Sequence, residues 1–143
     1  AGLSGPGTAE LRSEPLTRRL AVHIGAEVVR VGHALGHRIE PILGIAAERF
    51  AAATDSGAID ILGKDIAADA MSRTGGRPSM LQDVMKGRRT EIDYLNGFVA
   101  AEGRGAGVPT PFNDAVVAAF HAHAVGALRP DLRNLDPLVR LLP

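Results

Sequence analysis

Hydrophobic residues recur every three or four positions along most of this 143-residue chain, a spacing that places them on one face of an α-helix. Sustained alternation with a period of two, which would indicate strands, is not found in the sequence. The pattern predicts an all-α bundle of about six helices. These are expected over residues 15–35, 42–53, 59–73, 78–86, 91–102 and 112–129.

Turn-forming residues mark where these helices are expected to begin and end. Gly36 ends the first helix, and Pro130 ends the last one. Thr90 is expected to cap the helix over 91–102, because its side chain can accept hydrogen bonds from the first backbone N–H groups. Gly103 and the glycines after it are expected to end that helix.

The chain is expected to contain one domain preceded by a short linker. Residues 1–7 are rich in Gly and Pro and carry no periodic pattern, so we interpret them as a severed linker. Residues 8–143 then form the domain, since a chain of 143 residues that is 45% hydrophobic can bury a substantial core.

The composition argues against several classes of partner. Lys plus Arg and Asp plus Glu both number 16, so no net charge attracts nucleic acid or an anionic membrane. The chain has no cysteine, which excludes disulfides and thiolate metal sites. No apolar run reaches the roughly 18 to 20 residues that a membrane-spanning helix needs, and no signal peptide pattern opens the chain. We expect a cytoplasmic protein.

Two motifs are only weak indications of a metal site and of a dinucleotide-binding site. His33 and His37 have the spacing of two ligands on one helical face, but Gly36 lies between them and no third ligand stands nearby, so no metal site is predicted. The glycines at 103–107 do not follow a strand and do not complete a dinucleotide-binding fingerprint. No cofactor-binding residue is therefore predicted in this chain.

The polar stretch KGRRTE, residues 86–91, allows two interpretations. In one, it is a solvated turn in which Thr90 caps a helix and Glu91 is stabilised by the helix dipole. In the other, the Glu91 carboxylate and the Ser79 hydroxyl of the preceding helix face a shared cleft, where the carboxylate could position an ammonium or a substrate hydroxyl.

An ordered series of motifs resembles a known enzyme family. The motifs are SMLQD at 79–83, KGR at 86–88, TEID at 90–93, LNG at 95–97 and GVPTP at 107–111 followed by Asn113. Together they resemble the C-terminal helical domain of ketopantoate reductases, the 2-dehydropantoate 2-reductases of pantothenate biosynthesis. Residues 1–36 also look like the helix that follows the catalytic lysine motif of that family. The resemblance implies an all-α domain like those of ketopantoate reductase and 6-phosphogluconate dehydrogenase-type enzymes.

The resemblance also implies a mechanism and a missing partner. Such enzymes carry an N-terminal Rossmann domain that binds NADPH, and this domain is absent from the chain. The catalytic lysine would lie upstream of Ala1, Glu91 would stand near it as a catalytic residue, and Ser79 would bind the pantoate moiety of a small 2-keto acid. Pro78 replaces one of the two serines that the family usually has, which leaves the substrate open.

These implications lead to an expected function and to two alternatives. The expected function is NADPH-dependent reduction of 2-dehydropantoate by the full-length enzyme, with the isolated chain inactive. One alternative is a paralogous reductase of another 2-keto acid. The other is a non-catalytic helical module that forms a homodimer. Because removal of a partner domain exposes an apolar interface, the isolated chain is expected to self-associate.

Overall fold

The computed structural model describes the backbone of residues 1–72 and 78–143, and the side chains of residues 1–68 and 78–143. In this described part the chain is all-helical, as predicted, and strand-like pairing is confined to one antiparallel bridge between Ile42 and Ile45. The α-helices are α1 (Thr8–Ser13), α2 (Pro15–Ala34), α3 (Ala47–Ala52), α4 (Ser56–Ser72), α5 (Ser79–Met85), α6 (Asn96–Ala106), α7 (Pro111–His121) and α8 (Asp136–Val139), with a 3-10 helix, η1 (Leu132–Leu135), before α8.

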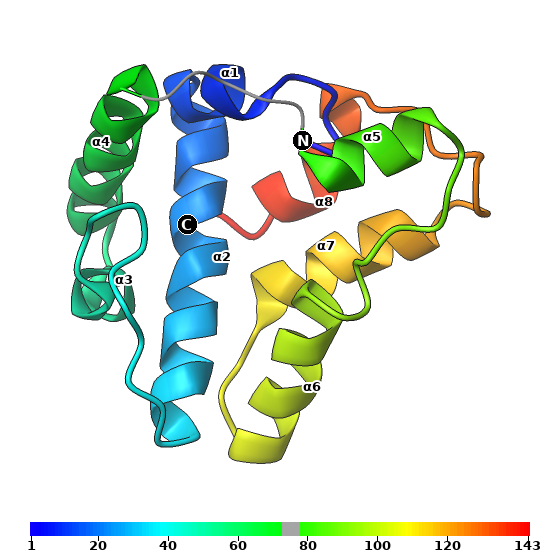
Figure 1. Cartoon of the computed structure of the whole chain (residues 1–143). Coiled ribbons are helices and arrows are strands. Elements are labelled where there is room, and N and C mark those ends of the chain that lie inside the picture. Colours follow the sequence, from blue (N-terminus) through cyan, green and yellow to red (C-terminus); the bar gives the residue numbers. More distant parts are fainter. Residues whose placement is uncertain (73–77) are drawn as a thin grey trace.

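The long helix α2 runs through the centre of the molecule. It begins with Pro15, and the side chain of Glu14 accepts a hydrogen bond from the N–H of Leu16 at 3.3 Å. Gly36, with φ of 79°, turns the chain away after the helix, as the sequence predicted. Figure 1 shows α3 and α4 on one side of α2 and α6 and α7 on the other.

Two hydrophobic clusters lie on the two sides of α2. The first cluster is built from α2, α3 and α4 and contains Val22, Ala26, Val29, Ile45, Ala47, Phe50, Ala53, Ile59, Leu62 and Ile66. The second joins α2 to α5, α7 and the C-terminal segment and contains Leu3, Leu20, Val84, Ile92, Phe112, Val116, Phe120, Leu128 and Leu138. Because α2 supplies residues to both clusters, it is buried around much of its circumference.

Several helix boundaries differ from the prediction. The helix predicted over 42–53 is shortened to α3, because Leu43 and Gly44 have φ of 54° and 74° and reverse the chain. Gly103 lies inside α6, which continues to Ala106 and ends at Gly107 with φ of 69°. The predicted end of the helix over 59–73 falls outside the described residues.

The last long predicted helix is also wrong in its C-terminal half. α7 ends at His121, and the chain from there to η1 is irregular. Gly126 has φ of 81° and comes close to the backbone of Gly87, a close approach that a straight helix over 112–129 would not make. The turn lets Leu128, only 6% exposed, reach the second cluster.

Residues 1–7 contain no helix, but they are packed into the domain. Leu3 and Ser4 are each 4% exposed. The carbonyl oxygen of Leu3 accepts hydrogen bonds from the backbone N–H of Asp131 and from Nδ2 of Asn134, both at 2.8 Å. The segment interpreted as a linker from sequence is therefore tied, in this structure, to the C-terminal segment.

Two glycines of α6 are expected to respond oppositely to substitution. A Cβ at Gly103 would lie 2.7 Å from Cγ2 of Thr110 and 2.8 Å from the carbonyl oxygen of Val108, whereas a Cβ at Gly105 would meet nothing within 4 Å. Gly103→Ala should lower the free energy of unfolding by about 1–3 kcal/mol through overpacking. Gly105→Ala should raise it by up to about 1 kcal/mol through helix propensity. Urea unfolding of the two variants measures both changes, and equal effects would contradict the close packing of Gly103 against Val108 and Thr110.

Candidate active site

Ser79 and Glu91, the two site residues predicted from the sequence, line the same cavity. Ser79 is the first residue of α5, and Glu91 lies in the turn between α5 and α6. The cavity has a volume of about 480 Å³, and both residues are solvent-exposed, which places them toward its open side. The structure thus brings a hydroxyl and a carboxylate from two separate elements to one cavity.

The turn that carries Glu91 differs from the helix start predicted for it. Thr90 does not cap a helix, and α6 begins only after the turn. The carbonyl oxygen of Glu91 instead accepts hydrogen bonds from the N–H groups of Tyr94 at 3.0 Å and Leu95 at 3.1 Å. Ile92, 3% exposed, is buried in the second cluster. Glu91 is therefore positioned by a turn that a buried neighbour anchors, and not by a helix dipole.

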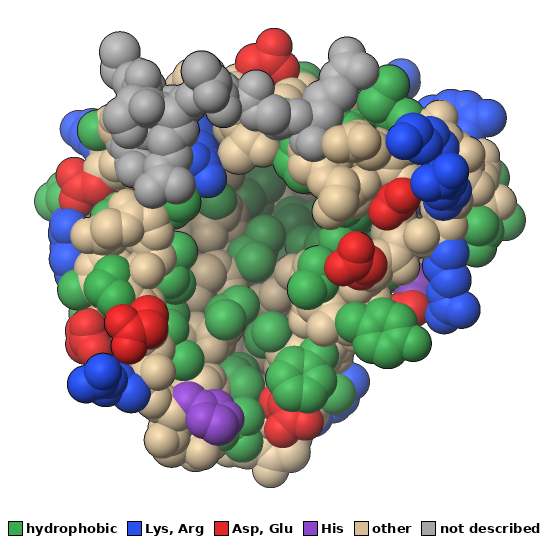
Figure 2. Space-filling view, viewed as in Figure 1, with side chains coloured by type: hydrophobic (Ala, Val, Ile, Leu, Met, Phe, Trp, Pro, Cys, Tyr) green, Lys and Arg blue, Asp and Glu red, His purple; other side chains and the backbone are tan. Residues whose placement is uncertain are grey.

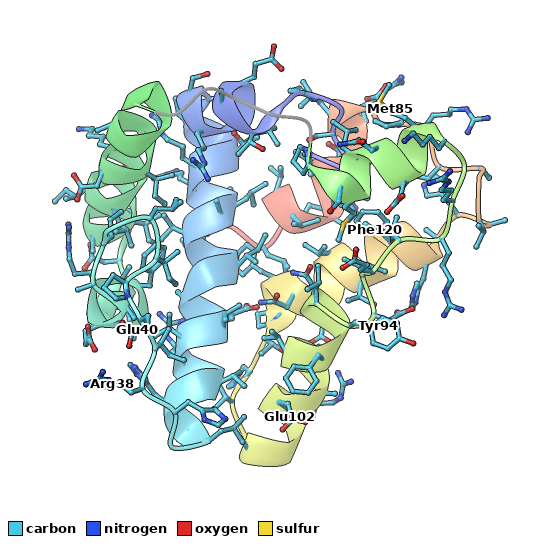
Figure 3. All side chains as sticks on the ribbon, viewed as in Figure 1. Arg38, Glu40, Met85, Tyr94, Glu102 and Phe120 are labelled. Atoms are coloured by element: carbon cyan, nitrogen blue, oxygen red, sulfur yellow. The ribbon has the colours of Figure 1, made fainter. Side chains whose placement is uncertain are left out.

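Most of the cavity wall is apolar. It includes buried side chains of the first residues, α2, α7 and α8, namely Leu3, Leu20, Val116, Phe120 and Leu138. Figure 2 shows a hollow lined by hydrophobic side chains on this face, and Figure 3 places Phe120 beneath α5. Arg12, Arg18 and Asn96 add polar groups to the wall. An apolar cavity with a few polar groups is typical of a small-molecule site.

The polar groups of Ser79 and Glu91 are available to a ligand. In the part of the chain that the structure describes, neither the Ser79 hydroxyl nor the Glu91 carboxylate makes a hydrogen bond or an ion pair. Arg18, by contrast, is held by its own neighbours, because Nη1 donates to the carbonyl oxygen of Ser13 at 2.7 Å. An exposed carboxylate and hydroxyl with no internal partner fit a role in binding.

A buried carboxylate on α2 is connected to the cavity wall by hydrogen bonds. Glu27, 3% exposed, accepts hydrogen bonds from the backbone N–H of Phe112 at 2.8 Å and of Asn113 at 2.9 Å. It also accepts one from Nδ2 of Asn113 at 2.6 Å. Oδ1 of Asn113 in turn accepts from Nδ2 of Asn96 at 2.8 Å, and Asn96 lines the cavity. A hydrogen-bonded chain thus runs from the core to the cavity wall.

The environment of Glu27 changes its acidity. Burial raises the pKa of the Glu27 carboxyl above its ordinary value, and the hydrogen bonds from Phe112 and Asn113 oppose that rise. Glu27 does not stand out in the sequence as a site residue. The available signal was a single carboxylate inside the apolar run at 26–29, where a charged side chain must find buried partners.

The basic part of the KGRRTE stretch faces a different, smaller cavity of about 260 Å³. Arg88 and Arg89 line it, together with His121 and Asp93. Asp93 is 3.5 Å from Nη2 of Arg89 and 2.8 Å from Nε2 of His121. The stretch therefore separates two cavities, with its arginines on one side and Glu91 on the other. The capping role of Thr90 in the first interpretation is wrong, and the binding role of Glu91 in the second stays a prediction.

The histidines do not form a metal site in the described residues. His33 and His37 are exposed, and no group of three or more potential ligands gathers in this part of the chain. His23 stacks on Phe112 with ring centroids 4.3 Å apart, and burial, followed by the nearby Arg30 and Arg19, lowers its pKa. Among the described helices, none has the length and apolar character needed to cross a membrane.

The structure is a helical domain with an apolar cavity, and comparison with known proteins assigns it to a family. A family model described as "Ketopantoate reductase PanE/ApbA C terminal" matches residues 1–124. The chain therefore belongs to the family of ketopantoate reductase C-terminal domains, a family of oxidoreductases.

A curated relative gives a shorter match. A 2-dehydropantoate 2-reductase of Lactococcus lactis subsp. lactis (strain IL1403) is 46% identical over 46 residues, which is 32% of this chain and 15% of the relative. The match thus spans only a small part of the relative's length. The comparison with solved structures gives no match.

Loss of the Glu27 carboxylate is expected to destabilise the domain strongly. Glu27→Ala leaves two buried backbone N–H groups and the Asn113 amide without their acceptor, so the free energy of unfolding should fall by about 3 kcal/mol or more. Glu40→Ala is the control, because the side chains of Glu40 and its ion-pair partner Arg38 are 79% and 90% exposed (Figure 3). It should cost no more than about 0.5 kcal/mol. Thermal and urea unfolding measure both, and a small effect of Glu27→Ala would contradict the network.

Proposed function

We propose that this chain is the substrate-binding half of an NADPH-dependent 2-dehydropantoate 2-reductase. The observation that carries the proposal is the shared cavity of Ser79 and Glu91 in a domain of the ketopantoate reductase family. The name of the Lactococcus lactis relative supports this choice of substrate. The reaction would convert the ketone of a 2-keto acid to a hydroxyl group.

In this proposal Glu91 acts by electrostatics. Its exposed carboxylate would hold the ammonium of a catalytic lysine supplied by another part of the full-length enzyme, at the point where that lysine protonates the ketone oxygen. The turn anchored by Ile92 keeps the carboxylate at the edge of the cavity. A fixed position matters because a general acid must remain within hydrogen-bond reach of the atom that it protonates.

Ser79 would bind the carboxylate end of the substrate. Its hydroxyl stands at the start of α5, and α5 also contributes the cavity-lining Met80. The apolar interior of the cavity would take the methyl groups of the substrate, since burial of each CH₂-sized group contributes about 0.8 kcal/mol. Pro78 leaves Ser79 as the only hydroxyl at the 78–79 position, which is the reason to test other 2-keto acids as well.

NADPH would supply the hydride, but the described residues of this chain do not fit an NADPH-binding site. The described residues include no strand on which a glycine-rich phosphate loop could stand. We assign cofactor binding to an N-terminal Rossmann domain of the full-length enzyme. An apolar surface next to the cavity suits such a partner domain. It consists of three exposed side chains, Tyr94, Leu95 and Phe98, whose exposed fractions are 79%, 50% and 59%.

The same surface favours a second candidate, a non-catalytic helical module that dimerises through Tyr94 and Phe98. NADPH oxidation by the full-length protein in the presence of a 2-keto acid separates the two functions. A panel of 2-keto acids then distinguishes a 2-dehydropantoate reductase from a paralogous enzyme. Absence of turnover with every acid would favour the module.

Neutralising Glu91 is expected to slow catalysis by the full-length enzyme. Glu91→Gln keeps the size of the side chain but removes the charge that holds the lysine, so kcat should fall by about 10²-fold. Glu102→Gln is the control, because Glu102 lies on α6 and does not line the cavity (Figure 3). NADPH oxidation at saturating 2-dehydropantoate provides the measurement, and unchanged kcat in Glu91→Gln would remove Glu91 from the mechanism.

Removal of the Ser79 hydroxyl is expected to affect binding more than turnover. Ser79→Ala should raise KM for 2-dehydropantoate by about tenfold, because a hydrogen bond to a charged group contributes about 1.5 kcal/mol or more. The residue is exposed, so thermal unfolding should not change. Steady-state kinetics give the KM and kcat values. A fall in kcat with constant KM would assign Ser79 to the chemical step instead.

A further inference from the structure

Asn113 is a buried amide on α7 whose side chain contacts three partners at once. It is 0% exposed and does not line the cavity that contains Ser79 and Glu91. Its Nδ2 donates to the Glu27 carboxylate at 2.6 Å and to the carbonyl oxygen of Ile24 at 3.3 Å. Its Oδ1 accepts from Nδ2 of Asn96 at 2.8 Å. Both ends of this amide are therefore engaged within the protein.

The orientation of the Asn113 amide follows from the chemistry of its partners. Glu27 accepts three hydrogen bonds and donates none among the described residues, which is the pattern of an ionised carboxylate. The carbonyl oxygen of Ile24 can also only accept. Both partners therefore require the NH₂ end of Asn113, so its oxygen faces Asn96. Because that oxygen can only accept, Asn96 is held in turn by its own NH₂ end.

The start of α6 and the turn that carries Glu91 form one hydrogen-bonded unit. The N–H of Leu95 donates to the carbonyl oxygen of Glu91 at 3.1 Å. The N–H of Gly97, inside α6, donates to the carbonyl oxygen of Ile92 at 3.0 Å. The N-terminus of α6 has no side-chain cap. The contact of Asn96 with Asn113 therefore constrains the position of the whole unit, including Glu91.

A second contact joins the same unit to α7, but it is exposed. Oδ1 of Asp93 lies 2.8 Å from Nε2 of His121, and the two side chains are 36% and 57% exposed. Solvent weakens a contact of this kind, so it contributes little to the position of the turn. A hydrogen bond to a fully buried amide is stronger, because the surroundings of that amide exclude water. Asn113 is therefore the stronger of these two constraints.

We propose that Asn113 is a positioning residue, which acts through Asn96 to hold the Glu91 carboxylate where it can orient the catalytic lysine. This inference rests on the proposed function of Glu91. Asn113 itself contacts neither substrate nor cofactor, so its effect on the reaction passes entirely through Glu91. A displacement of about 1 Å at a catalytic group can lower the rate by as much as about 10²-fold, since proton transfer requires close contact.

A double-mutant cycle in the full-length reductase that contains this chain tests whether Asn113 acts through Glu91. In the otherwise unmodified enzyme, Asn113→Ala should lower kcat for 2-dehydropantoate about tenfold and change KM by less than about twofold. In the Glu91→Gln background the same substitution should change kcat by less than about twofold, because the carboxylate that it displaces is already gone. NADPH oxidation at a temperature where every variant is folded gives both constants.

Two control variants separate positioning from stability. Arg30 donates to the carbonyl oxygens of Ala51 and Ala53, both at 3.2 Å, on the side of α2 that faces α3. Arg30→Met should lower the melting temperature, as Asn113→Ala does, but leave kcat within about twofold. His121→Ala removes the exposed contact with Asp93 and should also leave kcat within about twofold. A tenfold loss of kcat in either control would overturn the special role of Asn113.

The outcomes separate this inference from the proposed function. Equal losses of kcat from Asn113→Ala in both backgrounds, or no loss in either, overturn the positioning role and leave the proposed function intact. An unchanged kcat in Glu91→Gln, or no turnover of any 2-keto acid by the unmodified enzyme, overturns both. If Asn113→Ala does not fold, Asn96→Ala breaks only the last hydrogen bond of the series. The same cycle with Glu91→Gln must then show the same loss of additivity.

Discussion

The buried carboxylate of Glu27 joins the two halves of this domain. The first backbone N–H groups of α7 need acceptors, and no side-chain cap at the N-terminus of α7 provides one, since the hydroxyl of Thr110 donates to Asp114 instead. Glu27 supplies the acceptors from α2, far away in the sequence. Burial makes its charge costly, as the raised pKa of Glu27 indicates, and three short hydrogen bonds offset that cost.

This contact extends to the cavity through Asn113. Asn113 is fully buried, and its amide contacts Glu27 on one side and Asn96 on the other. Asn96 is the first residue of α6 and directly follows the turn that carries Glu91. Side-chain hydrogen bonds thus connect the core of the protein to the edge of its cavity. The position of the turn that carries Glu91 therefore depends on the packing of the core.

Sequence patterns predicted those features that depend on local chemistry. The apolar stripe of Ile59, Leu62 and Ile66 was sufficient to identify α4, and Pro15 and Gly36 bracketed α2 correctly. The failures have tertiary causes. The positive φ of Leu43 is imposed by the chain reversal at the Ile42–Ile45 bridge, and no local preference of leucine favours it.

The candidate site was also predicted only in part. Motif resemblance identified Ser79 and Glu91, and both line one cavity. Thr90 was misread because a threonine followed by acidic residues is typical of a helix start, while burial of Ile92 holds the chain in a turn instead. Glu27 was missed, since a single polar residue in an apolar stretch reveals its partners only in three dimensions.

The central position of α2 has a consequence for how the domain loses its structure. Val22 and Val29 belong to one hydrophobic cluster and Leu20 to the other, all on the same helix. Melting of one cluster alone would be costly, because it would expose to water the apolar side of α2 that the cluster covers. The two clusters are therefore expected to form a single cooperative unit, despite the separation of their side chains by the helix between them.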